Sequence, residues 1–230
     1  GKPVQYVPPH FALSINEVES SINKIHNQEY FSTKEAGCKY WWIEYGGRLD
    51  TIKETEEVKY RLLSVVYGIW NYIKNSGRFP ESRNLTLEWA GTIPGKRESR
   101  RFVGYYMLTQ QDIIEQRMQP DAVAFGGWSL DLHPADGVFS KEKKACTQWH
   151  AKGIYPIPYR CYITQHLDNL FLAGRIISAT HVAFASTRVM ATCAAGGEAV
   201  GTAAAYCIHH NCTPDELMDE QHMACLQTLL

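Results

Sequence analysis

The sequence contains no Cys-x-x-Cys pair, and its seven cysteines are scattered along the 230 residues. An odd number of widely spaced cysteines argues against a disulfide framework, and the missing pairs argue against an iron–sulfur cluster or a zinc finger. Cys207 and Cys212 flank His209 and His210, and these four side chains could bind a metal. The alternative is a helix end with buried thiols. We favour that alternative and expect no metal.

Excess charge and long hydrophobic runs are also missing. The formal net charge is −1 at pH 7, which gives no overall field that would attract nucleic acid. The segment nearest to membrane-span length, residues 189–208, is rich in alanine and glycine and includes Glu198. We therefore expect no membrane span, and a closely packed helix of a soluble protein at this place. The compartment stays unknown.

No G-x-G-x-x-G turn follows a predicted strand. The glycine pairs at residues 46–47, 126–127 and 196–197 lack that spacing. Such a turn holds the pyrophosphate of a dinucleotide. The sequence therefore has no complete dinucleotide-binding motif.

Helix signals are clear along the chain. Capping boxes at Ser14, Thr51 and Thr109 predict three helix starts. The second helix has apolar residues at three- and four-residue steps from Val58 to Ile73, and Gly77 should end it. Aromatic, β-branched and alternating residues predict strands at residues 40–45, 84–89, 102–108 and 121–125.

The chemistry is concentrated between Asp168 and Ala205. A short apolar run, residues 170–173, is typical of a buried strand, and the small residues from 189 to 205 predict a helix. A polar connector lies between them. Ligands bind beyond the carboxyl ends of strands in α/β sheets, and a helix N-terminus offers free N–H groups and partial positive charge. This order of elements favours a site for a large anionic cofactor.

The residues NLFLAGRIISATHVAFASTRVM, followed by GGEAVGTAAA, resemble the C-terminal FAD-contacting segment of the FAD-dependent oxidoreductases with a two-dinucleotide-binding-domain flavoprotein fold. The segments EYGG, IPGKRESRRFVGYYMLTQQD and GGWSLDLHP fit the same family more loosely. The resemblance implies FAD as the cofactor. The cofactor-binding residues that it implies are Ala173, Gly174, Arg175, Ser178, Thr187, Arg188 and Val189. Because such flavoproteins begin with the glycine-rich turn, we expect this chain to be a C-terminal portion whose nucleotide-binding half is missing.

The expected fold class is α/β. Residues 1–165 should form an α+β substrate or cap lobe. Residues 166–230 should supply the C-terminal strand and helix of an FAD-binding Rossmann-like lobe, together with a terminal helix.

Three residues are candidates for catalysis. His181 lies in the connector, where the family places the flavin ring, and could remove a hydroxyl proton from the substrate. The alternative is a buried histidine that bonds the backbone. Asp131 and His133 project to the same side of an extended chain, so they could orient a hydroxyl and take its proton. The alternative is a turn in which Asp131 bonds backbone amides.

Three further residues are candidates for substrate binding. Trp128 offers a stacking face for a sugar or another ring, and Arg100 and Arg101 could face an anionic group. For the arginines the alternative is an exposed basic turn. The predicted function is hydride transfer between FAD and a small polar substrate such as a carbohydrate or polyol. The alternatives are a non-catalytic carbohydrate- or partner-binding module that has lost its flavin half, and a subunit that completes an FAD site on a partner or a second copy.

Overall fold

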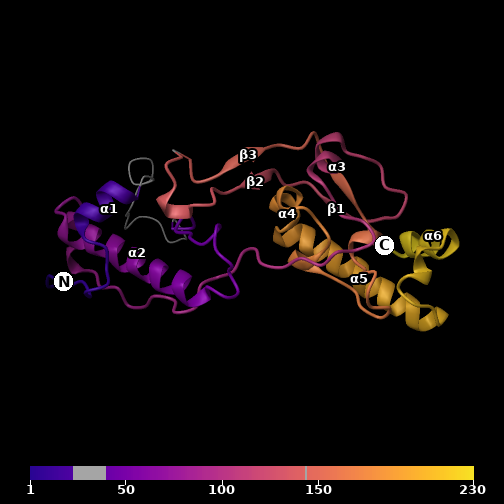
Figure 1. Cartoon of the computed structure of the whole chain (residues 1–230), viewed down its shortest axis with the longest axis horizontal. Helices are drawn as coiled ribbons and strands as arrows, with labels where there is room; N and C mark the ends of the chain where they lie inside the picture. The colour runs from indigo at the N-terminus through magenta and orange to yellow at the C-terminus, as the bar shows by residue number, and fades with distance from the viewer. Residues whose placement is uncertain (23–39, 143) are drawn as a thin grey trace. The chain divides into compact units, whose positions relative to one another are not determined.

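The computed structural model describes residues 1–22, 40–142 and 144–230, which form two compact units (Figure 1). Unit 1 comprises Gly1–Ser99 and His133–Cys146, and unit 2 comprises Arg100–Leu132 and Thr147–Leu230. This division follows contacts within the chain. The predicted lobes, residues 1–165 and 166–230, are defined by their expected roles and stay a prediction.

Unit 1 is helical. Its elements are α1 (Ile15–Ser21), α2 (Thr55–Asn75) and two short 3-10 helices, η2 (Pro80–Asn84) and η3 (Gly137–Phe139). The capping box predicted at Ser14 is confirmed, because the Glu17 amide donates to Ser14 Oγ and the Ser14 amide donates to the Glu17 carboxylate. The α1 and α2 helices pack against each other, and a core of apolar residues from both holds the unit together.

The long helix α2 confirms the predicted apolar face. Val65, Ile69 and Ile73 are buried in the core of unit 1. The helix begins later than predicted, because residues 51–54 form a turn and Glu54 rather than Thr51 precedes the first helical residue. Gly77 follows its end with a φ of +77°, a left-handed conformation that glycine adopts without strain.

Two predicted strands of unit 1 are wrong. Tyr40–Trp42 forms a turn instead, and the Glu44 carbonyl accepts a hydrogen bond from the Val138 amide of η3. In the second, residues 84–89, Asn84 ends η2, and the Leu85 carbonyl accepts a hydrogen bond from the Lys74 ammonium, which also bonds the Ser82 and Arg83 carbonyls of η2. These contacts use backbone groups that a strand would present to a neighbouring strand.

Unit 2 contains the remaining helices and both sheets. Its elements are α3 (Gln110–Glu115), β1 (Ala122–Gly126), β2 (Leu130–Leu132), β3 (Thr147–Trp149), β4 (Tyr155–Pro158), η4 (Tyr159–Cys161), η5 (Gly174–Ile176), α4 (His181–Thr187), α5 (Met190–His210), η6 (Glu216–Met218) and α6 (Glu220–Leu229). The predicted capping box at Thr109 and the predicted strand at residues 121–125 are both confirmed, as the start of α3 and as β1.

Each sheet has two antiparallel strands, β1 with β4 and β2 with β3. The mixed helix-and-strand content that we expected is therefore confirmed. A Rossmann-like lobe is built on a parallel sheet, and both sheets found in the described part of the chain are antiparallel. The Rossmann-like assignment stays an interpretation.

Three extended segments of unit 2 lie beside one another without forming regular strands. Residues 102–108 donate to the carbonyls of Ile176 and Ser178, and the Leu172 amide donates to Tyr162. Isolated bridges, Gly104 to Thr164 and Ile163 to Phe171, add to this arrangement. The strands predicted at residues 102–108 and 170–173 are therefore wrong as regular elements, although both segments are extended and pair with their neighbours. Their bonds go to different segments in turn, which prevents a continuous ladder.

The small-residue helix predicted from residue 189 is confirmed as α5. A Cβ atom built on Gly196 would lie 2.7 Å from the ring of Tyr162, which is itself buried. One built on Gly201 would meet nothing within 4 Å. Close packing therefore needs glycine at one of these positions and not at the other.

We expect Gly196→Ala to lower the free energy of unfolding by about 1–3 kcal/mol, because the buried Tyr162 ring cannot move aside without strain. Gly201→Ala is the matched control. It should raise this free energy by up to about 1 kcal/mol, since alanine favours helix and nothing obstructs it. Urea unfolding of both variants measures the difference. An equal gain in stability from both changes would contradict the close contact of α5 with Tyr162.

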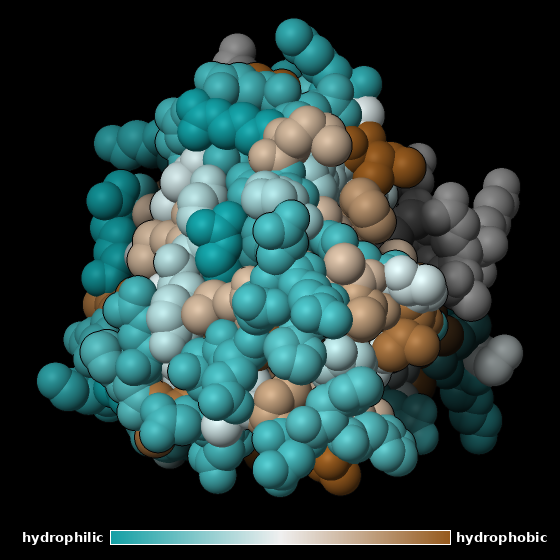
Figure 2. Space-filling view, turned by 90° about the vertical axis from the view of Figure 1, so that its right-hand side faces the viewer, coloured by the Kyte–Doolittle hydropathy of each residue, from teal (hydrophilic) through white to brown (hydrophobic). Residues whose placement is uncertain are grey.

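The surface carries apolar side chains in separate places. On the face shown in Figure 2, hydrophilic residues predominate and hydrophobic ones lie between them in small patches. Among the helices of the described ranges, none combines the length and the apolar character needed to cross a membrane.

Candidate functional site

Gly174 lies where unit 2 turns from the extended residues 171–173 into η5. Its φ is +67°, in the left-handed region, and a Cβ atom built on it would meet nothing within 4 Å. The glycine is therefore required by its backbone conformation and not by crowding from neighbouring residues. Its backbone leaves space that another molecule could approach.

The α5 helix packs against η5, and Cys193 in its first turn interacts electrostatically with Arg175 of η5, so the N-terminus of α5 lies in the same region. The N-cap of α5 is Val189, and within the described residues no side-chain capping bond is formed at the start of this 21-residue helix. The side chain of Met190, its first residue, is 88% exposed. An uncapped helix start offers N–H donors and partial positive charge to an anion.

Arg175 adds a full positive charge beside this helix start. Burial raises the pKa of the Cys193 thiol, and the charge of Arg175 partly offsets that rise. Cys193 is in the first turn of α5, so this electrostatic contact places Arg175 near the helix N-terminus. Ala173, which was also predicted to bind the cofactor, directly precedes Gly174. It is the N-cap of η5, has an extended backbone and is exposed.

Ser178 is fully buried, and its hydroxyl has no hydrogen-bond partner within the part of the chain that the structure describes. Its backbone is satisfied, since its amide donates to Cys161 and its carbonyl accepts from Leu108. A buried hydroxyl without a partner costs roughly 1–3 kcal/mol. A ligand could reach this hydroxyl only if the residues that cover Ser178 moved aside. A hydrogen bond from the ligand would then offset part of the free-energy cost of burying the hydroxyl.

The connector predicted from the sequence contains a helix that we did not predict, α4. Thr180 caps it by accepting a hydrogen bond from the Ala183 amide at 3.3 Å. His181 is its first residue and is exposed. Thr180 before a run of apolar residues was the signal that could have revealed this helix. His181 therefore projects from a helix start and is not one of the buried histidines that we considered as the alternative.

Thr187 and Arg188 end α4. Thr187 is buried, and its carbonyl accepts from the Cys193 thiol at 3.5 Å. The Arg188 guanidinium lies 2.9 Å from the Asp131 carboxylate, and both side chains are largely buried. This ion pair joins α4 to β2, so the arginine's charge is already balanced.

Asp131 lies on β2, and Gln148 of the neighbouring strand also donates to its carboxylate at 3.3 Å. We considered a pair of Asp131 with His133 and a turn with bonds to backbone amides. The Asp131 carboxylate accepts hydrogen bonds from Arg188 and Gln148, and its pairing with His133 stays a prediction.

Trp128 precedes β2 and is 48% exposed, so its ring is accessible for stacking. Its carbonyl accepts from Ser186 Oγ, which also bonds Tyr155 at 2.6 Å. Burial raises the pKa of the Tyr155 hydroxyl to about 12, so this hydroxyl stays protonated. Tyr155 and Ser186, which sequence reasoning did not select, thus hold the segment carrying Trp128 against α4.

The two candidate arginines differ in their surroundings. Arg101 donates from Nε to the Ala179 carbonyl at 2.8 Å, and its guanidinium lies over the Phe184 ring. It therefore holds the residues that precede α4. Arg100 is exposed.

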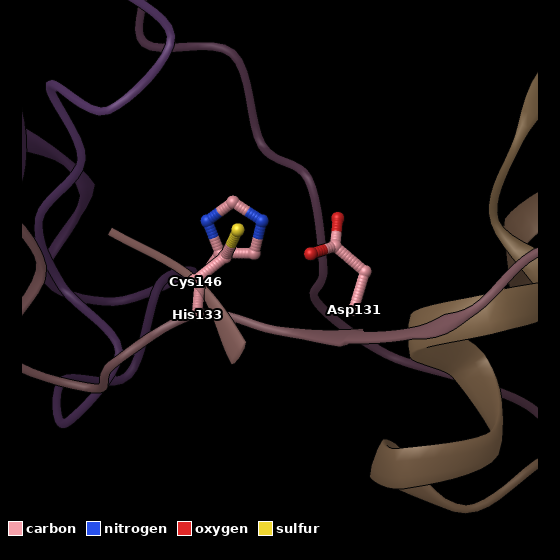
Figure 3. Close-up of side chains that lie close together, drawn as sticks. All are labelled: Asp131, His133 and Cys146. Atoms are coloured by element: carbon pink, nitrogen blue, oxygen red, sulfur yellow. The ribbon is translucent and has the colours of Figure 1, made fainter. Parts of the chain in front are cut away.

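His133 belongs to unit 1. Its Nδ1 atom lies 2.9 Å from the Glu44 carboxylate, which also pairs with Arg97 at 2.8 Å. A nitrogen of His133 and the sulfur of Cys146 lie within 4.8 Å of each other (Figure 3). Asp131, drawn in the same view, belongs to unit 2. In unit 1 His133 is thus part of a charged cluster with Glu44 and Arg97.

A comparison with protein-family models matches residues 2–230 to a family described as FAD dependent oxidoreductase. The chain belongs to this FAD dependent oxidoreductase family. Comparisons with curated proteins and with solved structures gave no match. Family membership confirms the resemblance seen in the sequence. It supports a general oxidoreductase function with FAD as the cofactor.

The region around η5 has features that fit FAD. FAD is large and carries a negatively charged pyrophosphate, and such groups bind at helix N-termini. Gly174 supplies accessible backbone, Arg175 supplies charge, and α5 supplies an uncapped helix start beside them. Ser178 would join them only after local opening, because its hydroxyl is buried.

Proposed function

We propose that unit 2 of this FAD dependent oxidoreductase holds part of the cofactor at Gly174, Arg175 and the N-terminus of α5, and that its substrate is a small polar molecule such as a carbohydrate or polyol. The observation that carries the proposal is the uncapped start of α5, packed beside the open backbone of Gly174. A family member needs a place for an anionic cofactor, and this arrangement meets that need with backbone donors and one arginine.

The residues would divide the work of binding. The backbone at Gly174 would allow close approach, and the Arg175 guanidinium would balance the charge of a phosphate oxygen. The first amides of α5 would stabilise negative charge. Thr187 and Arg188 would hold the start of α5 in place and would not contact the cofactor themselves. The Thr187 carbonyl accepts a hydrogen bond from Cys193, and Arg188 donates to Asp131. Val189 would fix the direction in which α5 begins.

Bound FAD would supply the hydride chemistry, and the protein would supply orientation and proton transfer. His181 is exposed at the start of α4 and would take the proton of a substrate hydroxyl at a ring nitrogen. Trp128 is accessible for stacking on the apolar face of a sugar ring. Arg100 and Arg101 would stay near the substrate only as secondary contacts, because Arg101 is occupied by the Ala179 carbonyl.

Absorption spectroscopy of the purified protein, expressed from its natural gene, tests this proposal. We expect the spectrum of a bound flavin, and loss of its visible band when a polyol or sugar is added without oxygen. A panel of substrates that includes amines and carboxylic acids shows whether hydroxyl compounds are preferred. A protein without flavin would favour the carbohydrate- or partner-binding alternative. Flavin that only amines reduce would reject the substrate class and keep the oxidoreductase assignment.

A further inference from the structure

The end of unit 2 contains an open pocket of about 580 Å³ between the C-terminus of α5 and the helices that follow it. The residues that line it include His210, Cys212, Asp215, Glu216, Asp219 and His222. Imidazole, thiolate and carboxylate are the ligand types that zinc and related divalent metals bind in proteins. No lysine or arginine is among the lining residues.

Two of these histidines share one tyrosine. The ring of His210 stacks on Tyr206 with centroids 4.0 Å apart, and the Tyr206 hydroxyl lies 2.9 Å from Nδ1 of His222. When Nδ1–H donates to this oxygen, the lone pair of the His222 ring is on Nε2. A metal-binding histidine commonly has such a partner on its other ring nitrogen, because that bond fixes its tautomer and orientation.

The spacing of the two rings suits one shared metal. Their centroids lie 6.2 Å apart. Two imidazoles that bind the same ion at about 2.1 Å have centroids roughly 5–6 Å apart. His210 is exposed, and no three of the lining side chains have ligand atoms within 4.8 Å of one another, so binding requires the rings and the carboxylates to turn toward the ion.

The charges around the pocket favour a cation. Two of the lining carboxylates, Glu216 and Asp219, each accept a hydrogen bond from a backbone amide with one of their two oxygens. Glu216 accepts from the Thr213 amide, and Asp219 accepts from the Gln221 amide at the start of α6. One oxygen of each carboxylate is left for another partner. The C-terminus of the 21-residue α5 adds partial negative charge at the same place.

We propose that this pocket binds a divalent transition-metal ion, with zinc as the representative, through His210, His222, Cys212 and a carboxylate of Asp215 or Asp219. This differs from the metal set considered from the sequence, because His209 does not line the pocket and His222, thirteen residues further on, does. The ion would join the end of α5 to α6 and stabilise the C-terminal part of unit 2. The proposal is independent of the cofactor proposal.

Zinc titration by calorimetry, on the whole chain with a reducing agent that does not bind metal, tests it. We expect one zinc ion per chain in this pocket. His210→Gln and His222→Gln should each lower the affinity at least about tenfold, as loss of a metal ligand or of its support does. His209→Gln is the matched control, because His209 is exposed on the same helix end and outside the pocket. It should bind zinc as the unchanged chain does.

Tyr206→Phe provides a second test. It keeps the ring that stacks on His210 and removes only the hydroxyl that bonds His222. Weaker zinc binding by this variant, with unchanged circular dichroism, supports the orienting role of Tyr206 and therefore the site.

Two affinity results would overturn the proposal. One is equal zinc affinity in the unchanged chain and in the His210→Gln/His222→Gln double variant. The other is a loss of zinc affinity in His209→Gln as large as the loss in His210→Gln or His222→Gln.

If the histidine variants do not fold, the imidazole NMR signals of the unchanged chain give the answer. We expect zinc to shift the signals of His210 and His222 and to leave those of His209 in place. Any other pattern would reject the site.

Discussion

Gly174→Val is expected to abolish flavin binding. The valine side chain would enter the space beside η5 that the backbone leaves open, and that space is where we propose the cofactor approaches. The φ of +67° adds strain, because a β-branched residue rarely adopts a left-handed conformation. Flavin content per protein chain, measured from absorption after purification and after dialysis against added FAD, reports the result.

The strain of this substitution needs its own control, and Gly77→Val provides it. Gly77 has a φ of +77°, and a Cβ atom built on it also meets nothing within 4 Å. It lies at the end of α2 in unit 1. Both variants should therefore lose a similar amount of stability, and only Gly174→Val should lose flavin. Normal flavin content in Gly174→Val would show that the cofactor is elsewhere. Equal loss in both would attribute it to strain.

The helices of this protein were largely predictable because their signals are local. Ser14 and Thr109 each bond an amide three residues later, and these bonds involve only neighbouring residues. The apolar face of α2 and the small residues of α5 are likewise periodic patterns within one segment. Thr51 shows the limit of a local signal, since a turn with Glu54 at the helix start replaced its capping box.

Most of the predicted strands, with the exception of β1, were wrong for the opposite reason. An extended segment becomes a strand only when a partner is available, and the partner is distant in the sequence. The carbonyl of Glu44 accepts a hydrogen bond from the Val138 amide, and the carbonyl of Leu85 accepts one from the Lys74 ammonium. Neither bond follows from the composition of the segment that it removes from a sheet.

The candidate site shows the same division. Gly174 and the start of α5 were found from sequence order, because a glycine after an extended run and a helix after a connector are local features. The ion pair of Arg188 with Asp131 joins residues 57 positions apart, and the hydroxyl of Ser178 loses its partners through packing. Charge balance and burial of this kind depend on the folded chain, so the sequence could name these residues but not their state.

His181→Ala is expected to lower turnover by about 10²–10⁴-fold, the usual contribution of a general base, and to leave the bound flavin in place. The histidine is exposed at the first position of α4, while Thr180 supplies the cap, so its loss should not unfold the helix. Steady-state turnover, together with flavin content, separates a chemical role from a binding role. His166→Ala is the control, because His166 is another exposed histidine of unit 2 outside the proposed site.

His181→Gln distinguishes proton transfer from simple hydrogen bonding. Glutamine can still donate to or accept from a substrate hydroxyl, but it cannot hold the transferred proton. If His181 is the base, glutamine and alanine should give similarly low turnover. Substantial recovery with glutamine would mean that His181 only positions the substrate. Full turnover in His181→Ala would remove the residue from the reaction, and the proton would then have to go to another group.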